Sequence, residues 1–184
     1  KGKEILILPA GGKTYKINLK NGKLIKSFGN GGYISTSTIT APIVDVKKNH
    51  LILVNHINKT VNVFNLKNGK REKFIPLFED KKNWTGGTPW SGVAYDSLNQ
   101  ILYTSTGNPQ PSLYGVKRFG NNEGSSSIIA VDIKNSKILW KFQDVFHDLW
   151  DFDIAFPPIL DDITIDGKKF PIVVAIPKTG NLIL

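Results

Sequence analysis

The fold is decided by a stretch that reads Thr60-Val61-Asn62-Val63-Phe64-Asn65-Leu66-Lys67-Asn68-Gly69-Lys70. Its first half alternates polar and apolar side chains, which is typical of a β-strand with one buried face. Asn68-Gly69 then supplies the two residue types that most readily adopt positive φ in a tight hairpin turn. The stretch therefore predicts a β-hairpin, with a second strand after Lys70.

The same pattern occurs twice more in the chain. Lys13–Lys23 repeats it with its Asn-Gly turn 47 residues earlier, and Ile128–Phe142 repeats it with its Asn-Ser turn 67 residues later. Strand-like apolar runs lie outside the copies, at Glu4–Pro9, Leu51–Val54, Ile101–Ser105, Phe170–Ile176 and Asn181–Leu184. Each repeat unit therefore holds about four short strands, and three copies indicate a repeat protein.

Four-stranded units that recur every forty to fifty or more residues are typical of β-propeller blades. Helical periodicity is nearly absent, and 17 glycines and 10 prolines punctuate the chain. We therefore expect an all-β fold of about three to four blades. So few blades cannot close a ring, so residues 1–184 are expected to be one partial propeller domain, truncated at both ends.

Composition excludes several classes of function. The 184 residues contain no cysteine, which excludes a disulfide scaffold and thiolate metal sites. No apolar run approaches the roughly 18 residues of a membrane-spanning helix. The formal net charge is +9, but the lysines sit at turns and form no basic stripe interleaved with aromatic residues. This favours a solvated surface, and we expect no nucleic-acid partner.

Three stretches carry residues that strands and turns do not need. They are Trp84–Gly92, Ser105–Pro111 and His147–Asp153. In the third, Asp151 and Asp153 face the same side of an extended backbone, where a cation or a shared proton would hold the two carboxylates together. An Asp-rich turn whose carboxylates cap backbone amides explains the same residues. His147 is interpreted as a hydrogen-bonded structural residue rather than a ligand.

Asn108, Trp90 and Lys178 each have an ordinary structural explanation as well. Asn108 lies between Gly107 and Pro109, where a turn residue is common. Trp90 suits blade packing, and Lys178 suits a solvated turn. Residue type alone does not decide between these interpretations and a functional site.

Taken together, these residues resemble the pyrroloquinoline quinone (PQQ)-dependent alcohol and sugar dehydrogenases, which are eight-bladed propellers. The most specific match is His147-Asp148-Leu149-Trp150-Asp151-Phe152-Asp153, followed by Asp162–Lys168 and by Pro177-Lys178-Thr179-Gly180-Asn181. The order and spacing are most similar to the membrane-associated glucose dehydrogenase branch. Trp140 resembles the family's docking tryptophan, which packs one blade against the next.

The resemblance implies a role for each candidate residue. Trp90 would form the aromatic floor under PQQ and Thr88 a polar contact to it. Asn108 and Asp151 match the metal ligands, with Asp153 as an additional ligand in some relatives. The implied ion is Ca²⁺, with a lanthanide or Mg²⁺ as alternatives. Asp151 also matches the catalytic base, and Lys178 the cation beside the quinone oxygens that shares in catalysis.

The resemblance further implies an alcohol or sugar substrate and a quinone or cytochrome electron acceptor. It implies a periplasmic location, with association to the inner membrane through a segment outside this chain. Two departures stand against it. The adjacent cysteine pair of the methanol dehydrogenases is missing, as it is in sugar-oxidising relatives. The segment Leu53–Thr60 is short and holds no acidic residue where a metal-binding acid is expected.

A non-catalytic propeller that serves as a protein-interaction scaffold is the alternative function. Such a scaffold would keep the hairpins and Trp140 but would have no reason to keep Asp151, Asn108, Trp90 and Lys178 in register. The shortened segment Leu53–Thr60 favours the scaffold, because a lost metal ligand weakens a site without unfolding a blade.

Overall fold

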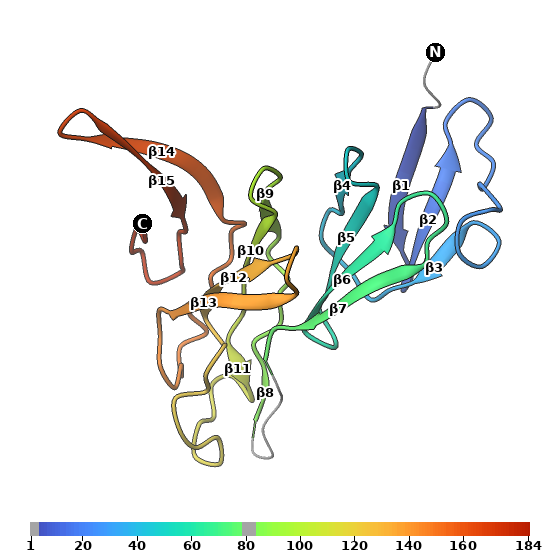
Figure 1. Ribbon diagram of the computed structural model, residues 1–184. Coiled ribbons are helices and arrows are strands. Elements are labelled where there is room, and N and C mark those ends of the chain that lie inside the picture. The colour runs from blue at the N-terminus through green and yellow to red at the C-terminus, as the bar shows by residue number, and fades with distance from the viewer. Residues whose placement is uncertain (1–3, 79–83) are drawn as a thin grey trace. The chain divides into compact units, whose positions relative to one another are not determined.

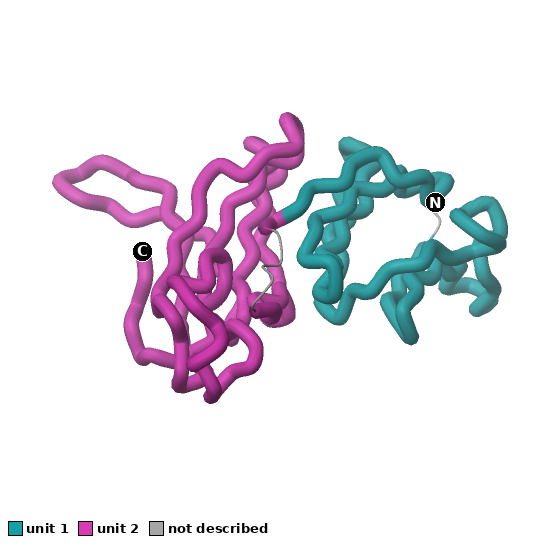
Figure 2. The backbone as a smooth tube through the Cα atoms, turned by 90° about the horizontal axis from the view of Figure 1, so that it is seen from below, with its two compact units in different colours: residues 1–76 teal, residues 77–184 magenta. Residues whose placement is uncertain are grey.

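The computed structural model describes residues 4–78 and 84–184, and every regular element in this part is a β-strand (Figure 1). The chain divides into two compact units, Lys1–Pro76 and Leu77–Leu184 (Figure 2). No helix long and apolar enough to cross a membrane occurs within the described ranges. The all-β prediction is confirmed.

The first unit contains two antiparallel sheets. One has the order β1(Ile5–Ala10), β2(Lys13–Asn18), β3(Tyr33–Ser35), and the other has the order β4(Ile43–Asp45), β5(His50–Asn55), β6(Thr60–Asn65), β7(Arg71–Pro76). The predicted hairpin is the β6–β7 pair, with Gly69 at φ 74° in its turn. The fold-deciding stretch therefore forms the third strand of a four-stranded blade and the turn that leads to the outer strand.

The earliest copy of the pattern departs from the prediction. Its expected second strand after Gly22 is reduced to one bridge between Leu24 and Ile17, and the outer position is taken up again by β3. Between these points the chain loops out through residues 26–32. Before the loop the amide of Ile25 donates to the Lys16 carbonyl, and after it the Gly32 carbonyl accepts from the amide of Lys16, both at 2.9 Å. Three glycines with positive φ, at positions 29, 31 and 32, allow this excursion.

The two sheets of the first unit share an apolar core. It consists of Phe28, Ile34, Leu51, Leu53 and Phe64, all buried. Burial of each such side chain stabilises the fold by about 1.5–3 kcal/mol. The turns also touch, because the amide of Gly29 donates to the carbonyl of Asn68 at 2.8 Å. The blades therefore pack closely enough that a side chain at position 69 would collide with Gly29.

The second unit carries the third copy of the pattern. Its four-stranded sheet has the order β9(Val93–Asp96), β10(Ile101–Ser105), β12(Ser127–Asp132), β13(Lys137–Gln143). A short pair joins β8(Thr85–Gly86) to β11(Pro109–Gln110), and a hairpin joins β14(Ile159–Ile165) to β15(Lys168–Val174). The β12–β13 hairpin confirms the third copy, and its Ser136 has φ 56°.

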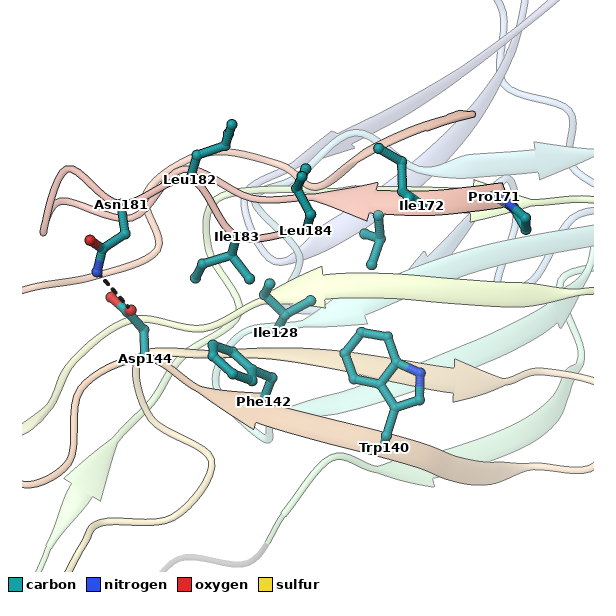
Figure 3. Close-up of a pocket in the computed structure, with 11 residues that line it drawn as sticks. Ile128, Trp140, Phe142, Asp144, Pro171, Ile172, Asn181, Leu182, Ile183 and Leu184 are labelled. Atoms are coloured by element: carbon teal, nitrogen blue, oxygen red, sulfur yellow. Dashed lines mark hydrogen bonds between the residues drawn. The ribbon is translucent and has the colours of Figure 1, made fainter. Parts of the chain in front are cut away.

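The predicted strand at Asn181–Leu184 is wrong. Only Ile183 pairs, in an isolated bridge with Ala175. The segment instead lines an apolar cleft together with Phe142 of β13 and Ile172 of β15 (Figure 3). Trp140 also lines this cleft, and its ring lies 5.9 Å from that of Tyr103. Trp140 thus faces Pro171 and Ile172 of the β14–β15 hairpin across the cleft, and its packing of one blade against the next stays a prediction.

Candidate functional site

All of the sequence-predicted site residues lie in the second unit, on its loops. Thr88 and Trp90 follow β8, Asn108 directly precedes β11, Asp151 and Asp153 follow β13, and Lys178 follows β15. The hydrogen-bonded strand pairs bring these loops to one end of the sheet.

Asp153 is the centre of the cluster. Its side chain is only 8% exposed, and Oδ1 accepts a hydrogen bond from the backbone amide of Asn108 at 2.5 Å. Its own carbonyl accepts from the amide of Lys178 at 2.9 Å, and Oδ2 lies 3.4 Å from Lys178 Nζ. Asp153 therefore joins the loop before β11 to the loop after β15.

Asp151 lies on the other side of the same ammonium group. Lys178 Nζ donates to Asp151 Oδ2 at 3.0 Å, and the Asp151 side chain is 49% exposed. Asp151 adopts φ 63°, in the left-handed region that non-glycine residues rarely occupy. One carboxylate is thus buried and fixed, and the other is open to solvent and to a ligand.

Charge and burial oppose each other within this trio. Burial raises the pKa of Asp153, although the Asn108 amide and the Lys178 charge act to lower it. Burial would lower the pKa of Lys178, but its hydrogen bond to Asp151 and the charges of both carboxylates raise it overall. The ammonium form of Lys178 is therefore favoured next to the two acids.

Trp90 and Thr88 border the cluster. The amide of Gly107 donates to the Thr88 carbonyl at 2.9 Å, which fixes the loop after β8 against the loop before β11. Trp90 is 38% exposed, and a Cβ placed on Gly107 would lie 2.7 Å from its Nε1 and 3.5 Å from Asp153 Oδ1. The indole edge therefore lies over the bare backbone of Gly107, with Asp153 beside it.

Asn108 contributes an unexplained polar group. Its residue is buried, and its side-chain Nδ2 has no hydrogen-bond partner. Its Oδ1 accepts from Gln110 Nε2 at 3.5 Å, but a buried amide nitrogen without a partner is uncommon and calls for an explanation such as a bound ion or ligand. A rotation of the amide by 180° would bring Oδ1 to this position, where it could bind a cation.

The possible metal ligands are Asn108, Asp151 and Asp153. Carboxylate and amide oxygens are the donors that Ca²⁺ prefers. Among residues 4–78 and 84–184, no group of three or more acidic or histidine side chains could hold a metal ion. The segment Leu53–Thr60 forms a tight β5–β6 turn in which Asn55 Oδ1 accepts from the amides of Ile57 and Asn58. It adds no acid.

His147 behaves as the sequence predicted. Its Nδ1 lies 3.0 Å from the carbonyl oxygen of Gly120, and its amide donates to the carbonyl of Asn121. The histidine therefore joins two loops and is a structural residue.

Sequence reasoning missed the buried Arg118, and it quoted the buried Asp148 only as part of the stretch His147–Asp153, without a role of its own. The carboxylate of Asp148 caps the amides of Trp150 and Phe152, and the guanidinium of Arg118 bonds the Asp148 carbonyl. The amide-capping explanation of the Asp-rich stretch thus holds for Asp148. The sequence did contain a signal for this role. Asp148 stands two residues before Trp150, a spacing at which an aspartate carboxylate can accept from a backbone amide.

The family model described as PQQ, glucose/ethanol/alcohol dehydrogenase, β-propeller domain, matches residues 59–184. The chain belongs to this family. The PQQ dehydrogenase propeller explains the repeat and the blade-like sheets described above.

Individual relatives agree with the family. The chain is 28% identical over 210 aligned positions to quinoprotein glucose dehydrogenase of Escherichia coli (strain K12). This alignment covers 96% of this chain and 26% of the relative. It is 36% identical over 94 positions to quinoprotein glucose dehydrogenase A of Acinetobacter calcoaceticus, covering 50% of this chain and 12% of that protein. The chain therefore spans about a quarter or less of the length of these relatives.

Solved structures match the fold. Quinohemoprotein alcohol dehydrogenase from Comamonas testosteroni superposes with a TM-score of 0.72 at 24% identity, over 92% of this chain and 30% of that one. A europium-containing methanol dehydrogenase gives a TM-score of 0.69 at 20% identity, over 99% and 39%. The chain is part of a PQQ dehydrogenase β-propeller.

Proposed function

We propose that this chain forms part of a PQQ-dependent dehydrogenase that oxidises an alcohol or an aldose. In this reaction a hydride moves from the substrate carbon to PQQ, and the electrons pass on to a quinone or cytochrome acceptor. The strongest support is that the ammonium group of Lys178 forms ion pairs with the carboxylates of Asp151 and Asp153. Asp153 Oδ1 also accepts a hydrogen bond from the backbone amide of Asn108. Residues that bond across 25 to 45 positions of the sequence thus share one small cluster.

The residues fit PQQ as a ligand. PQQ is a flat orthoquinone with three carboxylates, so it needs an aromatic surface and cationic or amide donors. Trp90 supplies a partly exposed indole, and Lys178 supplies a partly exposed ammonium group. The absence of a side chain at Gly107 leaves the indole undisturbed. We assign Trp90, Thr88 and Lys178 to the binding of this cofactor.

The residues also fit a hard cation. Asn108, Asp151 and Asp153 would hold Ca²⁺ through oxygen atoms, and the buried Asn108 Nδ2, which has no hydrogen-bond partner, is the observation that calls for a ligand here. A lanthanide or Mg²⁺ is the alternative, and one relative is named as a lanthanide-dependent methanol dehydrogenase. When bound, such an ion acts as a Lewis acid on a quinone carbonyl.

Asp151 is assigned as the catalytic base. Its carboxylate is half exposed, so a substrate hydroxyl can reach it and transfer a proton to it. Lys178 holds Oδ2 of this carboxylate at 3.0 Å and presents a positive charge to the reacting centre. Asp153, buried and anchored on two backbone amide contacts, keeps Lys178 in place.

Location and attachment are part of the same proposal. By family resemblance we place the enzyme in the periplasm, associated with the inner membrane through a segment outside this chain. The small-molecule substrate is an alcohol or a sugar.

A second candidate is a propeller that serves as a protein-interaction scaffold. It is favoured by one observation, the tight Leu53–Thr60 turn, which contains no acidic ligand. The scaffold requires neither the open Asp151 carboxylate nor the exposed indole of Trp90.

The test uses the full-length protein, loaded with PQQ and Ca²⁺ and supplied with alcohols and aldoses. Asp151→Asn should lower kcat by about 10²-fold or more while the melting temperature changes little, because the half-exposed carboxylate contributes little to the core. Asp162→Asn, an exposed carboxylate on β14, is the matched control and should be neutral. Near-normal turnover of Asp151→Asn would remove the residue from this role.

A further inference from the structure

A second carboxylate in the same loop holds the backbone around Asp151. Asp148 is 1% exposed, and its Oδ1 accepts from the amide of Trp150 at 2.8 Å. Its Oδ2 accepts from the amide of Phe152 at 2.7 Å. These amides flank Asp151, which adopts the left-handed φ of 63°. One buried side chain therefore fixes the chain directly before and directly after the strained residue.

Asp148 is itself anchored by a buried arginine. Arg118 is 0% exposed, and its Nη2 donates to the Asp148 carbonyl at 2.6 Å. The remaining contacts of the guanidinium hold the loop after β11, with Nε donating to Pro111 O, Nη2 to Ser112 O and Nη1 to Asn122 Oδ1. A buried guanidinium with four satisfied hydrogen bonds is a rigid anchor.

We infer that Asp148, anchored by Arg118, is a positioning residue that holds Asp151 in the left-handed conformation needed to present its carboxylate next to Lys178. This inference rests on the proposed function, because it concerns the residue assigned as the base. Asp148 does not touch the reacting atoms. Its carboxylate binds the amides of Trp150 and Phe152 and also accepts from Ser126 Oγ at 3.5 Å, and it acts on Asp151 through the two amides. We name the arrangement of Asp148 with the amides of Trp150 and Phe152 the Asp148 clamp.

The physical need for the clamp follows from the exposure of its neighbours. Trp150 is 73% exposed and Asp151 is half exposed, so packing alone does not hold this turn. A non-glycine residue in the left-handed region relaxes unless its surroundings determine its conformation. Groups behind a metal ligand that orient it typically affect metal affinity or activity by about 10–100-fold.

The experiment compares Asp148→Asn with Asp96→Asn in the full-length protein. Asp96 is the matched control, because its carboxylate also accepts from two backbone amides, those of Leu98 and Asn99, in the same unit. Neither of those amides lies in the candidate site. The measurements are kcat and KM, Ca²⁺ affinity of the PQQ-free protein by calorimetry, and hydrogen exchange at the amides of residues 150 and 152.

In Asp148→Asn the side-chain NH₂ group replaces one of the two carboxylate oxygens. This group is a donor, so it cannot accept from the backbone N–H that the oxygen had bound. We expect kcat and Ca²⁺ affinity each to fall about 10–100-fold with KM within about threefold, and exchange at residues 150 and 152 to accelerate. Asp96→Asn should leave kcat and Ca²⁺ affinity unchanged. A folded Asp148→Asn variant with kcat and Ca²⁺ affinity within twofold of wild type would overturn the inference, as would equal losses in Asp96→Asn.

A second test does not require the Asp148→Asn variant to fold, because it uses the wild-type protein alone. Its amides at residues 150 and 152 should exchange at least about tenfold more slowly than unbonded loop amides, because the clamp holds them. Unprotected amides at both positions would overturn the clamp. A wild type that neither turns over substrate nor binds PQQ would instead contradict the proposed function, and the exchange result would still decide the clamp.

Discussion

Gly107 offers a sharp test of the aromatic floor, because it has no side chain where Trp90 crosses the backbone. A Cβ added here would lie 2.7 Å from Trp90 Nε1 and 3.0 Å from Trp90 Cδ1. Ordinary contacts begin near 3.4 Å, so the indole edge must move by several tenths of an ångström. The backbone of Gly107 is not in the left-handed region, and Asp153 Oδ1 would remain at an ordinary 3.5 Å. Gly107→Ala therefore perturbs mainly one ring.

The expected magnitude follows from what an aromatic stack contributes. A well-placed aromatic pair is worth about 0.5–1.5 kcal/mol beyond its buried area, so a displaced indole should weaken PQQ binding roughly two- to twelvefold. The melting temperature without PQQ should change by no more than a few degrees, since the 38% exposed ring has room to rotate. PQQ titration with full-length Gly107→Ala, followed by fluorescence or calorimetry, measures the first effect.

A double-mutant cycle isolates the cause. In a Trp90→Ala background the substitution Gly107→Ala has no indole to displace and should alter PQQ affinity by less than about twofold. Equal losses of affinity in both backgrounds would show that Gly107 acts independently of Trp90. That result would refute the placement of the indole over Gly107.

Three further predictions concern stability. Burial raises the pKa of Asp153 above its ordinary value of 3.8. The free energy of unfolding of the metal-free protein should therefore fall as the pH rises from about 3.8 through the raised pKa. Urea titrations at several pH values measure this fall, and Asp153→Asn should abolish it. Gly69→Ala should destabilise by more than about 1 kcal/mol, since φ 74° is strained for alanine and its Cβ would meet Gly29 N at 2.8 Å. Leu51→Ala should cost about 2–5 kcal/mol in the same assay. An effect below 0.5 kcal/mol at either position would contradict the packing described.

The sequence was informative about the fold where a turn signal and strand alternation coincide. Asn68-Gly69 and Asn135-Ser136 each close the hairpin that was predicted. The same signal at Asn21-Gly22 gave only a one-residue bridge, because the glycines at 29 to 32 let the outer strand loop out and resume at Tyr33. Such an interruption depends on packing between blades, which a local pattern does not contain.

Knowledge of the site was limited in a different way. Spacing and residue type identified Asp151 and Asp153, but they could not show that one carboxylate is buried and the other half exposed. Arg118 was missed because a single arginine in an irregular loop has no periodicity, and the hydrogen bond that joins it to Asp148 spans 30 residues. Three-dimensional contacts determine the different roles of Asp148, Asp151 and Asp153.

The central claim is that this cluster binds PQQ together with a divalent cation. Calorimetric titration of PQQ into the folded full-length protein, with and without Ca²⁺, tests it most directly. We expect PQQ to bind, Ca²⁺ to strengthen this binding, and Asp151→Asn and Trp90→Ala each to weaken it. A folded protein that binds no PQQ in either condition would contradict the account and would favour the interaction scaffold.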